Sequence, residues 1–519
     1  MSLSSMLSRR LASRTAAPSL LRCAPRQTKC PRRQLARSLA TEALEVADKP
    51  SNYGQPLYQS HPHLVKPGEL TPGIPHEEYE LRRKALMNSL PDNSVVVCAA
   101  APIKYMSGAI FYKYRQASDF WYLTGFEEPD SAVILEKTST SKGYRMTLFC
   151  SGKNMAQEKW DGAKTGLGEA TAIFRADDTR SIDHFADHLR SLTSLYSHVF
   201  VDLDGSNTSR RRSRSVLKFL SPSNPNKSAL ETAMETFSLP ASKRRPLSAE
   251  VAKLRAIKSD AEMRVMRAAG DISGRAHAKT MRFAQPGMNE AQLAAHFAYL
   301  CSLSGSQRQA YVPVVASGPN ALIIHYTSNN QLVRAGELVL IDAGCEYNGY
   351  ASDITRTFPA SGVFPPAQRD IYQAVLSAQR ELVKMCTASS GHSLYTIHRE
   401  SRGMLRAELN QLPGFRLDLA DVDTLYPHFV SHPIGIDLHE SSNFDRSGEL
   451  RKGMVITIEP GIYVPPTAQF PKHFHDIGVR IEDEVAVGER HPTVLSVSAP
   501  KEIADVEAAC QGLLGLEPY

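Results

Sequence analysis

Residues 337–358, ELVLIDAGCEYNGYASDITRTF, carry the local pattern that is most informative about the fold. Its beginning, Glu337–Asp342, predicts a buried strand, because four aliphatic residues stand between the two acids. Asn348-Gly349 follows, which is the dipeptide preferred in a two-residue type I′ hairpin turn. The segment therefore predicts a β-hairpin that carries one acid on each arm, Asp342 and Asp353.

The register of this hairpin would place the two acids on the same face. A two-residue turn pairs Tyr347 with Tyr350 and, further along, Gly344 with Asp353. Because alternate residues of a strand share a face, Asp342 and Asp353 become diagonal neighbours with Cα atoms about 7–8 Å apart. Two carboxylates in this arrangement can share two metal ions that lie about 3.5–4 Å apart.

Two further acids stand in apolar strand-like segments. Glu459 ends Val-Ile-Thr-Ile-Glu, and Glu482 is expected inside the strand Val-Arg-Ile-Glu-Asp-Glu. Taken alone, Asp342 could simply end a strand and Asp353 could be a solvated hairpin residue. Acids flanked by Ile and Val are costly to bury without a partner, and metal coordination removes that cost.

A histidine-rich segment supplies a nitrogen ligand. His428, His432 and His439 fall within twelve residues, and Gly435 between them gives access to the backbone. A single histidine on an apolar stretch is more often a core residue than a ligand, but three in so short a segment favour the wall of an active site. His325, in Leu-Ile-Ile-His-Tyr-Thr, is a weaker candidate by itself.

The acids and one histidine together predict a dinuclear metal site. Four carboxylates and an imidazole suit divalent ions such as Mn²⁺, Co²⁺, Fe²⁺ or Zn²⁺, and four negative charges would balance two such ions. We expect Mn²⁺ first among these. The predicted ligands are Asp342, Asp353, His432, Glu459 and Glu482.

These residues, within the segments IDAG, SDITRTF, SHPIGIDLHE, TIEPGIY and GVRIEDEV, resemble the pita-bread metallopeptidases, which include methionine aminopeptidases, prolidases and Xaa-Pro aminopeptidases. The resemblance implies that Asp342 binds one ion, that Asp353 and Glu482 bridge both, and that His432 and Glu459 complete the second. It also implies a substrate site lined by His325, His428 and His439, with Arg480 beside Glu482 and Tyr463 as a further neighbour.

An upstream segment decides the branch of this family. Residues 115–130, RQASDFWYLTGFEEPD, look like the N-terminal domain of the Xaa-Pro aminopeptidase branch, which methionine aminopeptidases generally lack. Creatinase has a similar architecture without the metal ligands. No His-Glu-x-x-His helix, Gly-x-Ser-x-Gly elbow or phosphate loop is found, so other hydrolytic sites are poorly supported.

The expected chemistry is metal-assisted hydrolysis of a peptide bond. Two ions would activate a water near neutral pH, and Glu459 is the carboxylate that we nominate as proton shuttle. His439 and His325 could hydrogen-bond the substrate and the developing oxyanion. A metal that also held the free α-amino group would make the enzyme an aminopeptidase.

The first 41 residues have the composition of a mitochondrial transit peptide. They hold nine Lys and Arg residues and no acid, among many Ser, Ala and Leu. Taking these nine charges away from the formal net charge of +6 leaves −3. The alternative is a basic tail that binds nucleic acid, but no nucleic-acid partner is expected for the mature protein.

The end of this segment predicts a processing site. Matrix processing commonly leaves an Arg two residues before the cut, which here follows Arg37-Ser38 and exposes Leu39. Mitochondrial members of this branch resemble the intermediate cleaving peptidases. Those enzymes trim one bulky residue such as Tyr, Leu or Phe from imported precursors. We therefore expect such precursors as substrates, and self-trimming from Leu39 to Ala40.

The rest of the chain is expected to be an α/β protein of two domains. A Pro- and Ser-rich linker over 42–75 leads to a creatinase-like domain over 76–245, and a pita-bread catalytic domain follows over 250–505. The helix His76–Leu90 and short buried strands indicate the first domain. Ser259-Asp-Ala-Glu262 matches a capping box that would start the opening helix of the second.

Two further features bear on the location. No apolar run approaches the ~18 residues of a membrane span, so no transmembrane segment is expected, although peripheral attachment to the inner membrane is compatible with the sequence. The eight cysteines are dispersed without a Cys-x-x-Cys motif, which favours a reducing compartment. Arg210–Arg214 is expected in a solvated loop, and its alternative is a nuclear import signal that would give a secondary nuclear pool.

Three functions are compatible with the sequence. The first is trimming of a bulky residue from imported mitochondrial proteins, and the second is Xaa-Pro aminopeptidase activity. The third is a non-catalytic relative that binds peptides, which the complete ligand set disfavours because a binder has no need of paired ions. The family resemblance also implies a homodimer.

Overall fold

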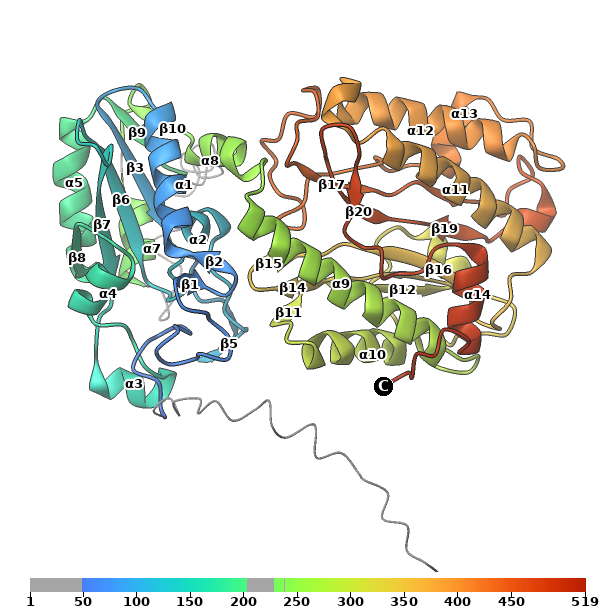
Figure 1. The fold of residues 1–519 in the computed structure, drawn as a ribbon, viewed down its shortest axis with the longest axis horizontal. Coiled ribbons are helices and arrows are strands. Elements are labelled where there is room, and N and C mark those ends of the chain that lie inside the picture. Colours follow the sequence, from blue (N-terminus) through green and yellow to red (C-terminus); the bar gives the residue numbers. More distant parts are fainter. Residues whose placement is uncertain (1–48, 203–227, 238) are drawn as a thin grey trace, which may run out of the picture. The chain divides into compact units, whose positions relative to one another are not determined.

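The computed structural model describes residues 49–202, 228–237 and 239–519. The predicted transit peptide, its processing site at Leu39 and the basic run Arg210–Arg214 lie outside the described residues. The described chain forms an N-terminal and a C-terminal α/β part (Figure 1).

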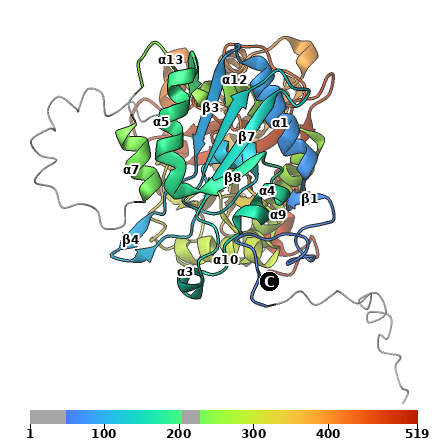
Figure 2. The same ribbon diagram turned by 90° about the vertical axis from the view of Figure 1, so that its left-hand side faces the viewer.

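The N-terminal part is built on a six-stranded mixed sheet in the order β10-β9-β3-β6-β7-β8. Helices α1 and α5 flank this sheet (Figure 2). β3, β6 and β7 coincide with the strands expected from short apolar runs, and they bury nearly all of their side chains. Within the segment expected to be a linker, residues 69–75 form the small sheet β1–β2, and Leu57 and Val65 are buried. The bounds of the elements are β1 Glu69–Thr71, β2 Ile74–Pro75, α1 His76–Ser89, β3 Ser94–Ala99, β4 Tyr105–Ser107, β5 Ile110–Phe111, α2 Ser118–Thr124, β6 Ala132–Lys137, β7 Tyr144–Cys150, α3 Met155–Asp161, α4 Leu167–Ile173, β8 Asp178–Ser181, α5 Phe185–Leu195, β9 His198–Phe200, α7 Ala229–Thr236, β10 Arg244–Arg245 and α8 Leu247–Arg255.

The C-terminal part consists of short antiparallel sheets between two groups of helices. Figure 1 shows α9 and α10 on one side of the strands and α11 and α12 on the other. The predicted capping box is present: Ser259 accepts a hydrogen bond from the backbone N–H of Glu262 at the start of α9. The bounds of the elements are α9 Asp260–Phe283, α10 Glu290–Leu303, β11 Arg308–Gln309, β12 Val314–Ser317, β13 Leu338–Asp342, β14 Cys345–Tyr347, β15 Tyr350–Ala351, β16 Thr355–Pro359, α11 Pro366–Lys384, α12 Leu394–Leu409, α13 Leu419–Leu425, β17 Val455–Ile458, β18 Gly461–Tyr463, β19 Gly478–Arg480, β20 Asp483–Ala486, β21 Thr493–Val494 and α14 Ile503–Gln511.

The predicted hairpin is confirmed. Tyr347 pairs with Tyr350, and Asn348 and Gly349 both have positive φ, as a type I′ turn requires. The same register continues into the pairing of β13 with β16, where Asp342 lies opposite Thr355. Asp342 and Asp353 are therefore diagonal neighbours on one face of the ribbon.

The two later acids lie at strand ends. Glu459 directly follows β17, as expected. Glu482, which was expected inside a strand, instead stands between β19 and β20. The reason is a change of partner: β19 pairs with β18 whereas β20 pairs with β17. The backbone N–H of Glu482 donates to Thr355 O at this junction, which brings the residue against the hairpin.

The two parts share a hydrophobic core. Tyr350 of the hairpin and Ile434 and Ile436 of the histidine-rich segment are buried in the same cluster as the N-terminal sheet. The rings of Trp121 and Tyr350 meet edge to face with centroids 5.8 Å apart. The segments that carry the predicted metal ligands therefore pack directly on the N-terminal part.

The six cysteines of the described residues are free, and five of them are buried. Among the described helices, none combines the length and the apolar character needed to traverse a bilayer.

We predict that Gly349→Ala lowers the free energy of unfolding more than Gly336→Ala. Both glycines have φ of +83°, so each alanine carries the same left-handed backbone cost of about 1–2 kcal/mol. A methyl group at 349 would stand 2.6 Å from the Trp121 ring, whereas no described atom lies within 4 Å at 336. Urea denaturation measures both, and equal losses would contradict the packing of the hairpin on Trp121.

Candidate metal centre and active site

The structure brings the five predicted ligands, the other three histidines and Arg480 to one cavity of about 410 Å³. The cavity lies among the hairpin, the histidine-rich segment and the ends of β17 and β19. Its lining includes the residues proposed from the sequence, which are His325, Asp342, Asp353, His428, His432, His439, Glu459, Arg480 and Glu482.

Three of the predicted ligands form a compact group. Asp353, His432 and Glu482 each offer one donor atom, and these atoms lie within 4.8 Å of one another. His432 Nε2 is 3.2 Å from Asp353 Oδ2, while its Nδ1 lies 3.2 Å from Pro433 O. When Nδ1–H donates to that carbonyl, the lone pair of Nε2 faces the carboxylates, which is the tautomer that a metal requires.

Glu459 and Asp342 lie on either side of this group. Glu459 Oε1 is 3.7 Å from His432 Nε2, and its Oε2 is 3.7 Å from His428 Nδ1. Asp342 Oδ2 accepts a hydrogen bond from Arg480 Nη2 at 2.6 Å. The five predicted ligands are thus adjacent, although they come from four separate segments of the chain.

Arg480 is the buried cation that contacts the acidic cluster through its guanidinium group. We expected it beside Glu482, and it is fully buried, with contacts to Asp342 and, at 2.7 Å, to the hydroxyl of Tyr463. Its Nε donates to Thr355 Oγ1 at 3.0 Å, and that hydroxyl donates to Glu482 Oε2 at 2.7 Å. Arg480 therefore reaches Glu482 through Thr355.

Two residues of the site were not found by the sequence analysis. The hydroxyl of Tyr311 lies 2.5 Å from Asp342 Oδ1 and 2.6 Å from Asp353 Oδ1. Glu484 Oε1 accepts the backbone N–H of Asp353 at 2.5 Å, which holds that ligand in place. Tyr311 belongs to no motif and its position depends on tertiary contacts, but the acidic repeat Glu482-Asp-Glu484 was a visible signal.

The charges of the site fit divalent cations. Burial, and then the neighbouring acids Asp353, Glu459 and Asp342, raise the pKa of Glu482 well above its usual range. Burial is also the main cause that raises the pKa of Glu459 to about 7. Buried carboxylates in such proximity are unfavourable as anions unless a cation balances them. Oxygen donors with one imidazole nitrogen are the chemistry that Mn²⁺, Fe²⁺, Co²⁺ or Zn²⁺ accepts.

The remaining histidines face the rest of the cavity. The His439 ring lies 4.1 Å from the His432 ring, centroid to centroid, and His428 Nε2 is 2.9 Å from the Tyr463 hydroxyl. Burial and the nearby Arg480 lower the pKa of His428 to about 3, so this imidazole is neutral. His325 is exposed at the cavity. The apolar part of the lining consists of Val312, Val314, Ile324, Phe429 and Leu438.

Comparison with known proteins finds two matching families. Residues 264–489 match metallopeptidase family M24, and residues 79–200 match the N-terminal domain of aminopeptidase P. These matches confirm the expected fold, an N-terminal α/β domain followed by a pita-bread catalytic domain.

Three relatives cover most of the chain. Intermediate cleaving peptidase 55 of Saccharomyces cerevisiae is 40% identical over 465 residues, which is 89% of each chain. A crystal structure of that protein without its first 58 residues has a TM-score of 0.74 at 37% identity and covers 86% of this chain and 99% of that one. Xaa-Pro aminopeptidase 3 of Rattus norvegicus is 35% identical and covers 92% of this chain and 94% of its own. The Arabidopsis thaliana protein named intermediate cleaving peptidase 55, mitochondrial, is 35% identical and covers 88% of this chain and 87% of its own.

We predict that Asp353→Asn weakens Mn²⁺ binding by at least about 100-fold, because even groups that only orient a ligand contribute about 10- to 100-fold. The amide keeps the shape of the side chain and removes its charge. Glu290→Gln is the control, because Glu290 is a buried carboxylate that accepts hydrogen bonds from Ser317 and Tyr326 and does not line the cavity. Titration calorimetry on chelator-treated protein measures the affinity. Wild-type affinity in Asp353→Asn would exclude this residue as a ligand.

Proposed function

The chain belongs to metallopeptidase family M24 and is a metal-dependent aminopeptidase, and we propose that it removes one bulky residue from the N-termini of imported mitochondrial precursors. The residue is Leu, Tyr or Phe, exposed when the presequence is cut. The observation that carries this proposal is that one cavity contains both a buried cluster of acidic metal donors and an apolar wall. The apolar wall consists of Val312, Val314, Ile324, Phe429 and Leu438. The donors supply hydrolytic chemistry, and the wall receives an apolar side chain.

Size and polarity of the cavity support a bulky first residue. The apolar lining residues come from three segments and include Ile324, Phe429 and Leu438. Burying a Leu or Phe side chain contributes about 1.5–3 kcal/mol, which a glycine or alanine cannot match. The wall therefore favours substrates that begin with a large apolar residue.

The chemistry assigns a task to each polar residue. Two divalent ions, Mn²⁺ first among them, would be held by Asp342, Asp353, His432, Glu459 and Glu482, and when bound would supply an activated water and a Lewis acid. Glu459 takes the proton from the attacking water and returns it to the leaving amine.

Histidine side chains bind the substrate. His439 and His325 donate hydrogen bonds to the peptide and to the oxyanion that develops on the scissile carbonyl. His428 is oriented by the Tyr463 hydroxyl, which itself accepts a hydrogen bond from Arg480. Arg480 thereby has two effects: it stabilises the acidic cluster, and through Tyr463 it orients His428 in the substrate site.

We assign the protein to the mitochondrion, in the matrix or peripherally on the inner membrane. The basic, acid-free composition of residues 1–41 supports this location, as does the similarity to a plant protein named as mitochondrial. A homodimer is part of the proposal, as is a secondary nuclear pool directed by Arg210–Arg214. Membership of an aminopeptidase family favours this enzyme over the non-catalytic peptide binder.

Xaa-Pro aminopeptidase activity is the second candidate. It is favoured by the 35% identity to a protein named Xaa-Pro aminopeptidase 3 over 92% of this chain. The two candidates share the metal site and the free N-terminus of the substrate. They differ in the residue that dominates recognition, which is the first residue in one and a proline at the second position in the other.

We predict that a peptide beginning Leu-Ala-Thr, as residues 39–41 do, is cleaved with a kcat/KM about 10- to 100-fold higher than the same peptide beginning Gly-Ala-Thr. A third peptide, Leu-Pro-Thr, separates the two candidates because it changes the second residue alone. Release of the first amino acid by the Mn²⁺-loaded enzyme is measured. Preference for the Leu-Pro peptide would replace the bulky-residue proposal with Xaa-Pro specificity.

Self-processing is a separate prediction. Active protein purified from mitochondria should begin at Ala40, because the enzyme removes its own Leu39, whereas Glu459→Ala should begin at Leu39. N-terminal sequencing of both forms measures the difference. Identical termini would reject self-processing and leave the peptide specificity unaffected.

A further inference from the structure

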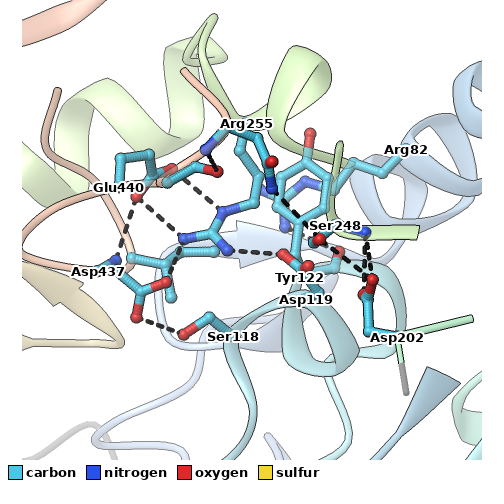
Figure 3. Close-up of polar contacts among 12 residues, drawn as sticks. Arg82, Ser118, Asp119, Tyr122, Asp202, Ser248, Arg255, Asp437 and Glu440 are labelled. Atoms are coloured by element: carbon cyan, nitrogen blue, oxygen red, sulfur yellow. Dashed lines mark hydrogen bonds and ion pairs between the residues drawn. The ribbon is translucent and has the colours of Figure 1, made fainter. Parts of the chain in front are cut away.

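One feature of the N-terminal part is not used by the chemistry above, namely the start of the segment RQASDFWYLTGF, residues 115–126. Three of its polar side chains, near the start of α2, reach the loop that follows His432 or the side chain of Arg255. Arg115 and Ser118 donate to this loop, and Asp119 forms an ion pair with Arg255. Figure 3 shows Ser118 beside Asp437 and Asp119 beside Arg255. This loop, residues 432–440, carries both a predicted metal ligand and the substrate-binding His439.

Arg255 is the centre of these contacts. Its side chain is 4% exposed and forms ion pairs with acids from both parts of the protein. Nη1 is 2.6 Å from Asp119 Oδ1, and Nη2 is 2.7 Å from Asp437 Oδ2. Nε and Nη2 also donate to the two oxygens of Glu440, at 3.2 and 3.0 Å. Arg255 thus binds three carboxylates with three nitrogens, which a lysine cannot reproduce.

Two of the three acids that Arg255 binds flank His439. Asp437 and Glu440 stand two residues before and one residue after His439. The loop is closed on itself as well, because the backbone N–H of Glu440 donates to Pro433 O at 2.9 Å. Movement of either acid would therefore move His439 relative to His432.

The N-terminal part fixes the same loop from its other side. Ser118 Oγ donates to Asp437 Oδ1 at 2.5 Å, and Arg115 Nη2 donates to Ile436 O at 2.7 Å. Arg255 itself ends α8, whose first turn is held by Asp202, a residue that follows the N-terminal strand β9. Figure 3 shows the Asp202–Ser248 contact and the Arg255 cluster at the two ends of this helix.

We propose that Arg255 is a positioning residue that couples the N-terminal domain to catalysis by holding the His439 loop through Asp437 and Glu440. Its described contacts include neither the metal donors nor the cavity lining, so its effect passes through His439. The N-terminal domain then acts as a fixed support for the substrate-binding histidine. This inference rests on the proposed role of His439 in binding substrate.

The test is a double-mutant cycle between Arg255→Lys and His439→Ala. The substrate is whichever of the Leu-Ala and Leu-Pro peptides the wild-type enzyme cleaves, so failure of the specificity proposal does not affect the test. We expect Arg255→Lys to lower kcat/KM by about 10- to 100-fold with the Mn²⁺ content unchanged. In the His439→Ala background the same substitution should have little further effect, because residues that act through one another are not additive.

Arg83→Lys is the matched control. Arg83 is a buried arginine of the N-terminal part that donates to Tyr144 Oη and Leu123 O, and none of its described contacts reaches the His439 loop. Its substitution should lower the melting temperature without coupling to His439→Ala. Asp119→Asn removes only the N-terminal partner of Arg255 and should reproduce the loss of kcat/KM in milder form.

A second measurement does not depend on turnover. The rate at which diethyl pyrocarbonate modifies His439, followed by peptide mass spectrometry, should rise in Arg255→Lys and stay at the wild-type value in Arg83→Lys. Additive effects in the cycle, or unchanged reactivity of His439, would show that Arg255 only stabilises the fold and would overturn the proposal.

Discussion

The main physical constraint on this protein is the electrostatic repulsion among four carboxylates that lie close together in one cavity. Asp342, Asp353, Glu459 and Glu482 line one cavity, where they are buried or half-buried, and the buried Arg480 donates a hydrogen bond to Asp342. Such a cluster is stable as anions only when cations of higher charge are present. The acidic cluster therefore favours divalent metal ions, and the metal-dependent activity of the family is consistent with this preference.

Tight antiparallel geometry makes this cluster possible. The type I′ turn sets one register for the whole hairpin, which places two acids diagonally on one face. The change of strand partner at Glu482 then brings a third acid against Thr355 of the same ribbon. Each predicted ligand is held on a strand or beside one, where neighbouring hydrogen bonds restrict its movement more than a free loop would.

The N-terminal domain contributes to the site without entering it. Its hydrophobic core includes Tyr350 from the hairpin and Ile434 from the histidine-rich segment, and its Asp119 forms an ion pair with Arg255. Support of this kind explains why an aminopeptidase of this branch retains a second domain that supplies no ligand. Placement of a substrate-binding histidine within a fraction of an ångström requires a rigid surrounding, and two packed domains supply it.

The hairpin, the family and the α/β organisation could be predicted from the sequence alone, and a candidate ligand set could be proposed from it, because each of these rests on local patterns. Strand periodicity and Asn348-Gly349 specify a register, and the aliphatic runs around the acids indicate that these side chains are buried. The position of Tyr311 between two acids and the position of Glu482 at a junction of strands became visible only in the folded structure. It alone showed that Arg255 joins two domains. These contacts connect residues far apart in the chain, and no local spacing encodes which distant side chain will meet which acid.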